Sequence, residues 1–310
     1  MKPLAGEEIV GNWGTLLLPI NSDESLNMLR LSEELDVLTS SGVNGIYSFG
    51  TAGEFYNTTE QEFDEVSQLM AEKCHASGTA FQIGASHMSP ITSLNRIRRC
   101  REFEPSAIQV ILPDWFKVTD EEALSFLEKM AEEAGDIGLV LYNPPQSKRD
   151  LAPLDFKFLK NRIPSLVGIK VAGGNEQWYA QIREHCPTIS VFIPGHLLAT
   201  GYRKGAHGAY SNVACLNPRT AQKWFESIVA EEEAALDLER RINAFFSSYI
   251  HPLISEKGYS NQAVDKCLAR IGNWSPVGTR LRWPYKWIPE EYADSLRPKA
   301  KEMLPEFFNV

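Results

Sequence analysis

Residues 166–174 read LVGIKVAGG, a short apolar run that ends in two glycines. A continuous apolar run of this length, with no polar alternation, is typical of a strand buried on both faces of a parallel sheet. Lys170 interrupts the run near its carboxyl end. Similar runs recur along the chain, and their recurrence determines the predicted fold.

The other apolar runs have comparable lengths and fairly even spacing, and helical patterns separate them. They are Thr15–Pro19, Gly45–Gly50, Ala80–Ala85, Ala107–Pro113, Ile137–Asn143, Ile189–Pro194 and Gly208–Val213. Capping boxes at Thr59–Glu62 and Thr119–Glu122 begin two of the helical segments, and Gly135 ends the second. Eight strands alternating with helices predict an α/β fold, a (β/α)8 TIM barrel, and favour it over a doubly wound open sheet.

The strand pattern stops near residue 230. Three helices are expected beyond that point, at Glu231–Ile254, Gln262–Ile271 and Glu290–Met303. We therefore expect a barrel over residues 1–229 and a C-terminal helical extension over residues 230–310 that packs on the barrel.

Composition narrows the class of protein. The chain of 310 residues has 31 Lys plus Arg against 40 Asp plus Glu, a net charge of −9 that disfavours nucleic acid or an anionic membrane as a partner. No apolar run approaches the ~20 residues of a membrane span, and no signal peptide is visible. The five cysteines are far apart and form no CxxC motif, which fits free thiols in a reducing cytoplasm.

Candidate catalytic residues are sought at the carboxyl ends of the strands, where barrel enzymes place their active sites. Burial of Lys170 in an apolar strand would lower its pKa, and a neutral amine forms Schiff bases with carbonyl compounds. A structural lysine paired with a carboxylate such as Glu54 is equally compatible with this position. Tyr142, which ends the preceding strand, could relay protons or could simply bond the backbone. The N–H groups of the Gly50–Glu54 turn could bind an anion.

Three motifs in this order resemble the N-acetylneuraminate lyase/dihydrodipicolinate synthase superfamily. Its members are class I, lysine-dependent pyruvate aldolases and related lyases on (β/α)8 barrels. The matching segments are Gly50–Glu54 (GTAGE) for G-[TS]-[TS]-G-E, Tyr142–Pro145 (YNPP) for Y-N-x-P, and Gly168–Lys170 (GIK) for G-x-K. The resemblance covers nearly the whole chain.

This resemblance implies a catalytic role for three residues. Lys170 would form a Schiff base with the 2-oxo group of pyruvate or another 2-oxo acid, Tyr142 would shuttle the proton, and Thr51 would support the tyrosine hydroxyl. The implied partners are a 2-oxo acid and an aldehyde. The implied assembly is a homotetramer built as a dimer of dimers, or a homodimer. No metal and no organic cofactor would be needed, because the iminium itself is the electron sink.

The resemblance also implies a set of substrate-binding residues. The backbone N–H groups around Ala52 and Gly53 would hold the substrate carboxylate, and Tyr210 would line the Schiff-base pocket through its backbone. Trp115 and His196 are expected to contact the remaining part of the substrate.

Several positions depart from the family pattern. Ala52 replaces a hydroxyl residue, Trp115 stands where dihydrodipicolinate synthases have a tyrosine, and Ser147 where they have an arginine. Sialic acid lyases carry acidic residues after the glycine that ends strand seven, where Leu197 and Leu198 stand here. We therefore expect neither of these two activities. Together with His87 and His196, Trp115 suggests a less polar, even aromatic, aldehyde.

Other functions are weighed against this interpretation. A class II metal site at His87, His196 and His207 is disfavoured, because no two of them have HxH or HxxxH spacing. A dehydratase or hydratase-aldolase that uses the same lysine stays open. A non-catalytic 2-oxo acid binding protein is disfavoured, because a sensor would not need Lys170, Tyr142 and Thr51 together.

Overall fold

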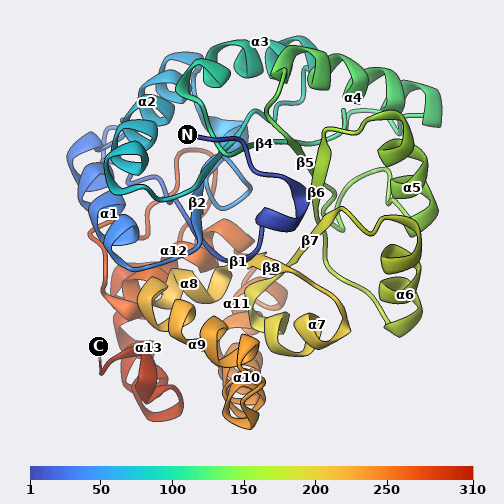
Figure 1. Ribbon diagram of the computed structural model, residues 1–310. Helices are drawn as coiled ribbons and strands as arrows, with labels where there is room; N and C mark the ends of the chain where they lie inside the picture. Colours follow the sequence, from blue (N-terminus) through green and yellow to red (C-terminus); the bar gives the residue numbers. More distant parts are fainter. Residues whose placement is uncertain (310) are drawn as a thin grey trace.

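The computed structural model describes residues 1–309 and contains a closed barrel of eight parallel strands (Figure 1). Each strand pairs with the next one in the chain, and the last pairs with the first. This topology confirms the predicted (β/α)8 barrel and excludes the open sheet. The strands are β1 Gly11–Thr15, β2 Gly45–Tyr47, β3 Phe81–Gly84, β4 Ala107–Val110, β5 Leu139–Tyr142, β6 Leu166–Lys170, β7 Ser190–Ile193 and β8 Gly208–Tyr210.

The first strand lies earlier in the chain than the sequence predicts. The predicted strand was Thr15–Pro19, whereas β1 is Gly11–Thr15. This strand contains two glycines and an asparagine, so its apolar signal is weak, while the leucines at 16–18 are buried beyond its end. A Cβ atom on Gly14 would lie 2.9 Å from a methyl carbon of Leu38, so a larger residue here would require the Leu38 side chain to shift. Burial alone therefore does not distinguish this strand from the buried loop that follows it.

Helices surround the barrel as an outer layer (Figure 1). Both predicted capping boxes form, at the starts of α2 and α4, and Gly135 ends α4. The helices are α1 Met28–Ser40, α2 Glu60–Ser77, α3 Pro90–Cys100, α4 Asp120–Ala134, α5 Pro153–Arg162, α6 Glu176–His185, α7 Leu198–Lys204, α8 Asn212–Leu216 and α9 Pro218–Val229. Short 3₁₀ turns occur at Gly6–Glu8, Phe55–Asn57, Arg101–Phe103, Gly195–Leu197 and Pro305–Phe307.

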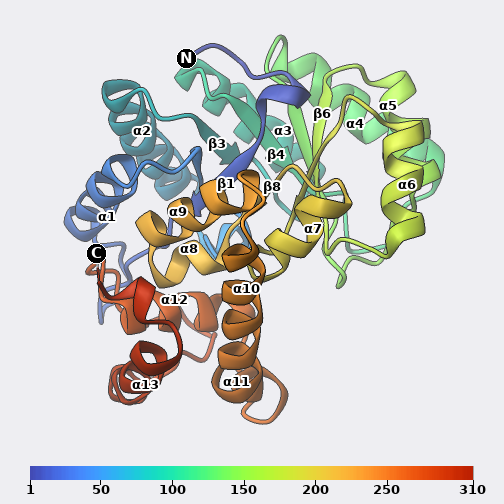
Figure 2. The same cartoon turned by 60° about the horizontal axis from the view of Figure 1, so that its bottom comes forward.

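The C-terminal region is helical at the three predicted places. It consists of α10 Glu233–Phe245, a π-helical segment Phe246–Ile250, α11 His251–Ser255, α12 Asn261–Gly272 and α13 Glu290–Met303. Figure 2 shows these helices gathered on one side of the barrel, next to α8 and α9. One hydrophobic cluster includes both Leu216 of α8 and Ile271 of α12, so the extension shares the core of the outer layer. The predicted division between residues 229 and 230 stays a prediction.

A second hydrophobic cluster fills the interior of the barrel. Its buried members are Ile9, Trp13, Tyr47, Ala107, Val140, Phe192 and Tyr210. The rings of Tyr47 and Tyr210 meet edge to face, with centroids 4.7 Å apart. The interior of the barrel is therefore a packed core and not an open channel.

Two further expectations concern the whole chain. The five cysteines are all buried and free, as the sequence predicts. Within residues 1–309, no helix has the length and apolar character that crossing a membrane requires.

Candidate active site

A cavity of about 400 Å³ opens at the carboxyl ends of the strands, where barrel enzymes hold their active sites. Side chains from several strand ends line it on one side, and side chains from the C-terminal extension line it on the other. Most of the residues predicted from the sequence meet there. Those that line the cavity are Thr51, Ala52, Tyr142, Lys170, His196 and Tyr210.

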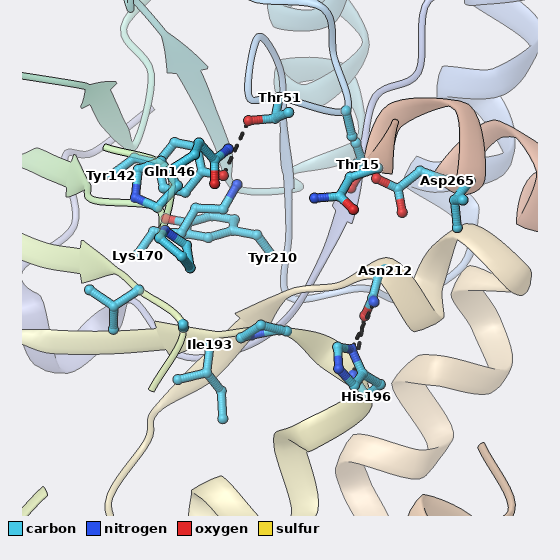
Figure 3. A pocket seen from close by; sticks show the side chains of 18 of the residues that line it. Thr15, Thr51, Tyr142, Gln146, Lys170, Ile193, His196, Tyr210, Asn212 and Asp265 are labelled. Carbon is cyan, nitrogen blue, oxygen red and sulfur yellow. Dashed lines mark hydrogen bonds between the residues drawn. The ribbon is translucent and has the colours of Figure 1, made fainter. Parts of the chain in front are cut away.

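Lys170 enters the cavity beside Tyr142, because β5 and β6 place these two residues in direct register. The lysine Nζ lies 4.1 Å from the ring centroid of Tyr142, 4.7 Å from that of Tyr47 and 5.2 Å from that of Tyr210. Figure 3 shows the lysine between the Tyr142 and Tyr210 rings. Aromatic faces attract a cation, so this enclosure favours a positively charged nitrogen once one has formed.

The surroundings of Lys170 also favour a neutral amine before reaction. Burial lowers the pKa of Lys170 to about 7, while the charges of Asp265 and Cys215 act in the opposite direction. A substantial fraction of the amine is then unprotonated at neutral pH, as a nucleophile requires. The alternative of a structural pair with Glu54 is not what the chain forms, because Glu54 pairs with Lys266 instead.

Tyr142 is held by a side chain, not by the backbone. Its hydroxyl lies 3.1 Å from Oγ1 of Thr51, and either oxygen can be the donor. Burial raises the pKa of Tyr142, although the Thr51 hydrogen bond opposes the change. The phenol is thus protonated at neutral pH and can exchange a proton with a group beside Lys170 or with Thr51.

Side-chain hydrogen bonds fix the two other tyrosines around Lys170. Thr15 Oγ1 donates a hydrogen bond of 2.7 Å to the Tyr47 hydroxyl, and the Tyr210 hydroxyl donates one of 2.6 Å to Oε1 of Gln82. The ring of Tyr210 faces Lys170, whereas the sequence predicted a contribution from its backbone. These bonds hold the aromatic enclosure in place.

The Gly50–Glu54 turn brings backbone close to the lysine. A Cβ atom on Gly50 would lie 3.3 Å from Lys170 Nζ and 2.9 Å from a ring carbon of Tyr47, so this position needs a glycine. Within residues 1–309, no backbone hydrogen bond uses the N–H groups of Thr51, Ala52 or Gly53. Unused N–H groups in such a turn can bind an anion beside the amine.

An ion pair that the sequence analysis missed fixes this turn. Lys266 Nζ of α12 donates hydrogen bonds of 2.6 Å to Oε1 of Glu54 and 2.7 Å to the Arg280 carbonyl oxygen. The side chains of Lys266 and Glu54 are 0% and 2% exposed. Phe49, just before the turn, and Glu54, at its end, have left-handed φ values of 50° and 51°. The buried pair therefore connects the extension to a turn with unusual backbone geometry.

His196 forms a specific contact on the opposite wall. Asn212 Oδ1 accepts a hydrogen bond from the His196 backbone N–H, and Asn212 Nδ2 lies 2.8 Å from His196 Nδ1 (Figure 3). Because an amide nitrogen only donates, His196 Nδ1 accepts and the ring proton is on Nε2. Burial lowers the pKa of His196. The ring is therefore a neutral donor at the cavity wall.

Other sequence candidates lie outside the cavity. Trp115 is 70% exposed and is not among the lining residues, and neither are Gly53, Leu197 and Leu198. His87 Nδ1 accepts a hydrogen bond of 2.9 Å from the Ser89 N–H, next to the start of α3.

In the loop after β5, Gln146 lines the cavity and Ser147 does not. Among the described residues, no three His, Cys, Asp or Glu side chains gather as a metal site.

The extension supplies lining residues that the sequence analysis did not consider. They include Phe246, Ile250, His251, Ile254, Asn261, Val264 and Asp265. The sequence does contain a sign of these residues, because the segment AVDKC at 263–267 places two charges in an apolar stretch of helix. A charge inside an apolar run is also the feature that identifies Lys170 as a candidate.

Comparisons with known proteins agree with this geometry. The chain is 28% identical over 299 residues to a 4-hydroxy-tetrahydrodipicolinate synthase of Methylococcus capsulatus, covering 95% of this chain and 98% of the relative. A prophage protein of the dihydrodipicolinic acid synthase family from E. coli K12, solved in complex with pyruvate, superposes with a TM-score of 0.82 at 18% identity. That match covers 95% and 98% of the two chains.

A sialic acid aldolase of Ruminococcus gnavus has the same fold, with a TM-score of 0.83 at 17% identity over 97% of this chain and 99% of that one. The model of the dihydrodipicolinate synthetase family matches residues 9–303. The match confirms the resemblance inferred from the three motifs. The chain therefore belongs to the dihydrodipicolinate synthetase family.

Proposed function

We propose that this protein is a lyase of the class I aldolase type, in which Lys170 forms a Schiff base with pyruvate or another 2-oxo acid. The observation that carries the proposal is the environment of Lys170. An amine with a pKa lowered to about 7 by burial is enclosed by three tyrosine rings in a cavity at the strand ends. The pyruvate complex of one structural neighbour and the aldolase activity named for another support the same chemistry.

The turn beside the lysine orients the 2-oxo acid. Its carboxylate accepts hydrogen bonds from the unused N–H groups of Thr51 and Ala52, which line the cavity. The adjacent 2-oxo carbon then lies next to Lys170 Nζ, because the turn approaches that nitrogen at Gly50. A Cβ atom on Gly50 would occupy this space.

The reaction begins when the neutral Lys170 amine adds to the 2-oxo carbon. Tyr142 gives a proton to the carbinolamine oxygen, water leaves, and a protonated iminium forms among the aromatic rings. With a 4-hydroxy-2-oxo acid, the Tyr142 phenolate then takes the proton of the 4-hydroxyl group. The C3–C4 bond breaks, its electron pair moves toward the iminium to give an enamine, and an aldehyde leaves. Protonation of the enamine and hydrolysis release pyruvate.

Hydrogen exchange into pyruvate tests the proposal without knowledge of the aldehyde. The enamine exchanges the methyl hydrogens of pyruvate with solvent, so incubation in D₂O should abolish the methyl proton signal in NMR. Lys170→Met should lose this exchange. Lys160→Met is the matched control, because Lys160 is also half-buried with a lowered pKa but bonds the carbonyl oxygens of Pro164 and Leu166. That variant should exchange like the parent protein.

The outcomes separate the alternatives. Exchange that is lost in Lys170→Met and kept in Lys160→Met supports an enamine on Lys170. A protein that binds pyruvate without exchanging its methyl hydrogens is a binding protein, and that result would contradict the proposal. Exchange that persists in Lys170→Met would assign the chemistry to another residue.

A further inference from the structure

The C-terminal extension forms the wall of the cavity that lies opposite the strand ends. Most of this wall is apolar, but Asn261 and Asp265 of α12 also line the cavity. They are four residues apart in the helix and therefore lie on one face. Asn261 is exposed at the mouth, and Asp265 is partly buried. This helical face is the polar part of the wall.

The position of Asp265 is fixed by its neighbours in α12. The next residue, Lys266, makes the buried ion pair with Glu54 and a hydrogen bond to the Arg280 carbonyl oxygen. Gln262, one turn earlier, donates a hydrogen bond of 2.5 Å to the Tyr56 hydroxyl. The helix is thus held against the turn that borders Lys170, and these contacts keep the Asp265 backbone beside the cavity.

The carboxylate of Asp265 accepts no hydrogen bond from any group among residues 1–309, and the charge that acts on it is that of Lys170. Among the described residues, it is the only acidic side chain that lines the cavity. Figure 3 shows it reaching from α12 toward the space that Lys170 enters from β6. Burial raises the pKa of Asp265 to about 7, although the charge of Lys170 opposes the change. A partly buried carboxylate without a donor is unfavourable unless a ligand supplies one.

We propose that Asp265 is a specificity-determining residue that accepts a hydrogen bond from a hydroxyl group on the aldehyde-derived part of the substrate. The substrate class is then a hydroxylated 2-oxo acid, cleaved to or formed from a hydroxyaldehyde. This inference rests on the proposed function, because the Schiff base at Lys170 sets which end of the substrate faces Asp265.

The charges in the cavity favour a hydroxyl group of the substrate over a charged one. An anionic group would be repelled by the carboxylate. A cationic group would be repelled by the iminium that forms at Lys170 in the same cavity. His196, a neutral donor through Nε2, lines the wall formed by β7 and its following turn. A hydroxyl group can donate to Asp265, and a second one can accept from His196.

This substrate class differs from the less polar aldehyde expected from the sequence. That expectation depended on Trp115, His87, His196, Leu197 and Leu198, and of these only His196 lines the cavity. Within residues 1–309, the one acidic group of the cavity wall thus comes from the extension, and His196 adds a neutral donor from the turn after β7.

Condensation of pyruvate with two matched aldehydes tests the inference. Glyceraldehyde carries two hydroxyl groups that propanal lacks, and the enamine adds to either carbonyl carbon to give a 4-hydroxy-2-oxo acid. We expect the parent protein to favour glyceraldehyde in kcat/KM. Asp265→Leu keeps a branched side chain of similar shape but removes the acceptor, so it should lower kcat/KM for glyceraldehyde about 10- to 150-fold. The value for propanal should not fall.

Two further variants guard against misfolding and general charge effects. Asp265→Asn keeps a neutral acceptor and should fall between the parent protein and Asp265→Leu. Glu256→Gln removes a carboxylate from an exposed site in the same extension and should leave the preference for glyceraldehyde unchanged.

Deuterium exchange into pyruvate, measured on the same preparations, keeps this inference separate from the proposed function. Exchange should persist in both Asp265 variants, because it involves no aldehyde. If exchange persists but the ratio of the two kcat/KM values is the same in Asp265→Leu as in the parent protein, Asp265 does not read a hydroxyl group. Equal efficiency of the parent protein with both aldehydes would overturn the inference too. Absence of exchange from the parent protein overturns the proposed function and this inference with it.

Discussion

Tyr142 and Lys170 are direct register partners at the carboxyl ends of β5 and β6, and the lysine Nζ lies 4.1 Å from the centroid of the tyrosine ring. Neighbouring parallel strands place the two side chains at the same height above the barrel core. The amine therefore has an aromatic face and a phenol as fixed neighbours. The phenol can exchange a proton, and the aromatic ring can stabilise a positive charge on the lysine nitrogen.

Replacement of Tyr142 by phenylalanine should separate these two contributions. The ring that faces Lys170 is kept, so pyruvate should still be trapped on Lys170 by borohydride. Turnover should slow about 10²- to 10⁴-fold, which is the usual contribution of a general acid–base group. Steady-state kinetics and trapping on the same preparation measure both effects. Full activity of Tyr142→Phe would show that the hydroxyl has only a structural role.

The pH dependence of trapping should report the lowered pKa of Lys170. Only the unprotonated amine adds to the 2-oxo carbon, so the rate should rise with pH up to about 7 and level off above it. An ordinary lysine, with a pKa near ~10.4, would give a rate that keeps rising to pH 10. The initial rate of pyruvate trapping by cyanoborohydride from pH 5.5 to 9.5 measures the midpoint. A midpoint above pH 9 would contradict the proposed environment of the amine.

Alanine at Gly50 should impair binding of the 2-oxo acid. The added Cβ atom would meet a Tyr47 ring carbon at 2.9 Å and the Lys170 amine at 3.3 Å, where the substrate has to lie. We expect a higher KM for pyruvate in the deuterium exchange assay, with little change in the urea midpoint. Gly50 has no positive φ, so alanine there adds the Cβ atom without left-handed backbone strain. An unchanged KM in Gly50→Ala would place the carboxylate elsewhere.

The Lys266–Glu54 pair should contribute strongly to stability. Removing one partner of a buried pair leaves an uncompensated charge and costs about 3–5 kcal/mol. Lys266→Met should therefore lower the free energy of unfolding by that amount, and a second change, Glu54→Gln, should restore part of it. Urea denaturation measures the free energy, provided that the m value is unchanged.

The matched control for that experiment is a pair with the same geometry at the surface. Lys73 Nζ lies 2.6 Å from Asp36 Oδ1, the same distance as in the buried pair, but these side chains are 29% and 60% exposed. Lys73→Met should change the stability by less than about 1 kcal/mol. Equal effects of Lys73→Met and Lys266→Met would show that burial does not strengthen the pair.

Much of the barrel could be predicted from the sequence, because parallel strands buried on both faces leave continuous apolar runs. Lys170 was identifiable for the same reason, since a charge inside such a run is conspicuous. The first strand was misplaced because β1 owes its position to glycines and close backbone approach, whereas the leucines at 16–18 are buried in a loop. Apolar content reports burial and does not report hydrogen-bond pairing.

The wall of the candidate site that the C-terminal extension forms could not be predicted in this way. Restricting candidates to strand ends excludes Asp265, which reaches the cavity only because α12 packs against the Gly50–Glu54 turn. Trp115 follows a strand, yet its side chain points away from the cavity into solvent. Which side chains of a loop or a distant helix face a cavity depends on tertiary packing, and a local sequence pattern carries little of that information.

Reductive trapping followed by peptide mapping tests the central claim most directly. The protein is incubated with pyruvate and borohydride, digested, and analysed by mass spectrometry to locate the reduced adduct. The Schiff-base assignment predicts one modified residue, Lys170, and no modification in Lys170→Met. An adduct on another lysine, or none with pyruvate or any other 2-oxo acid tested, would contradict it.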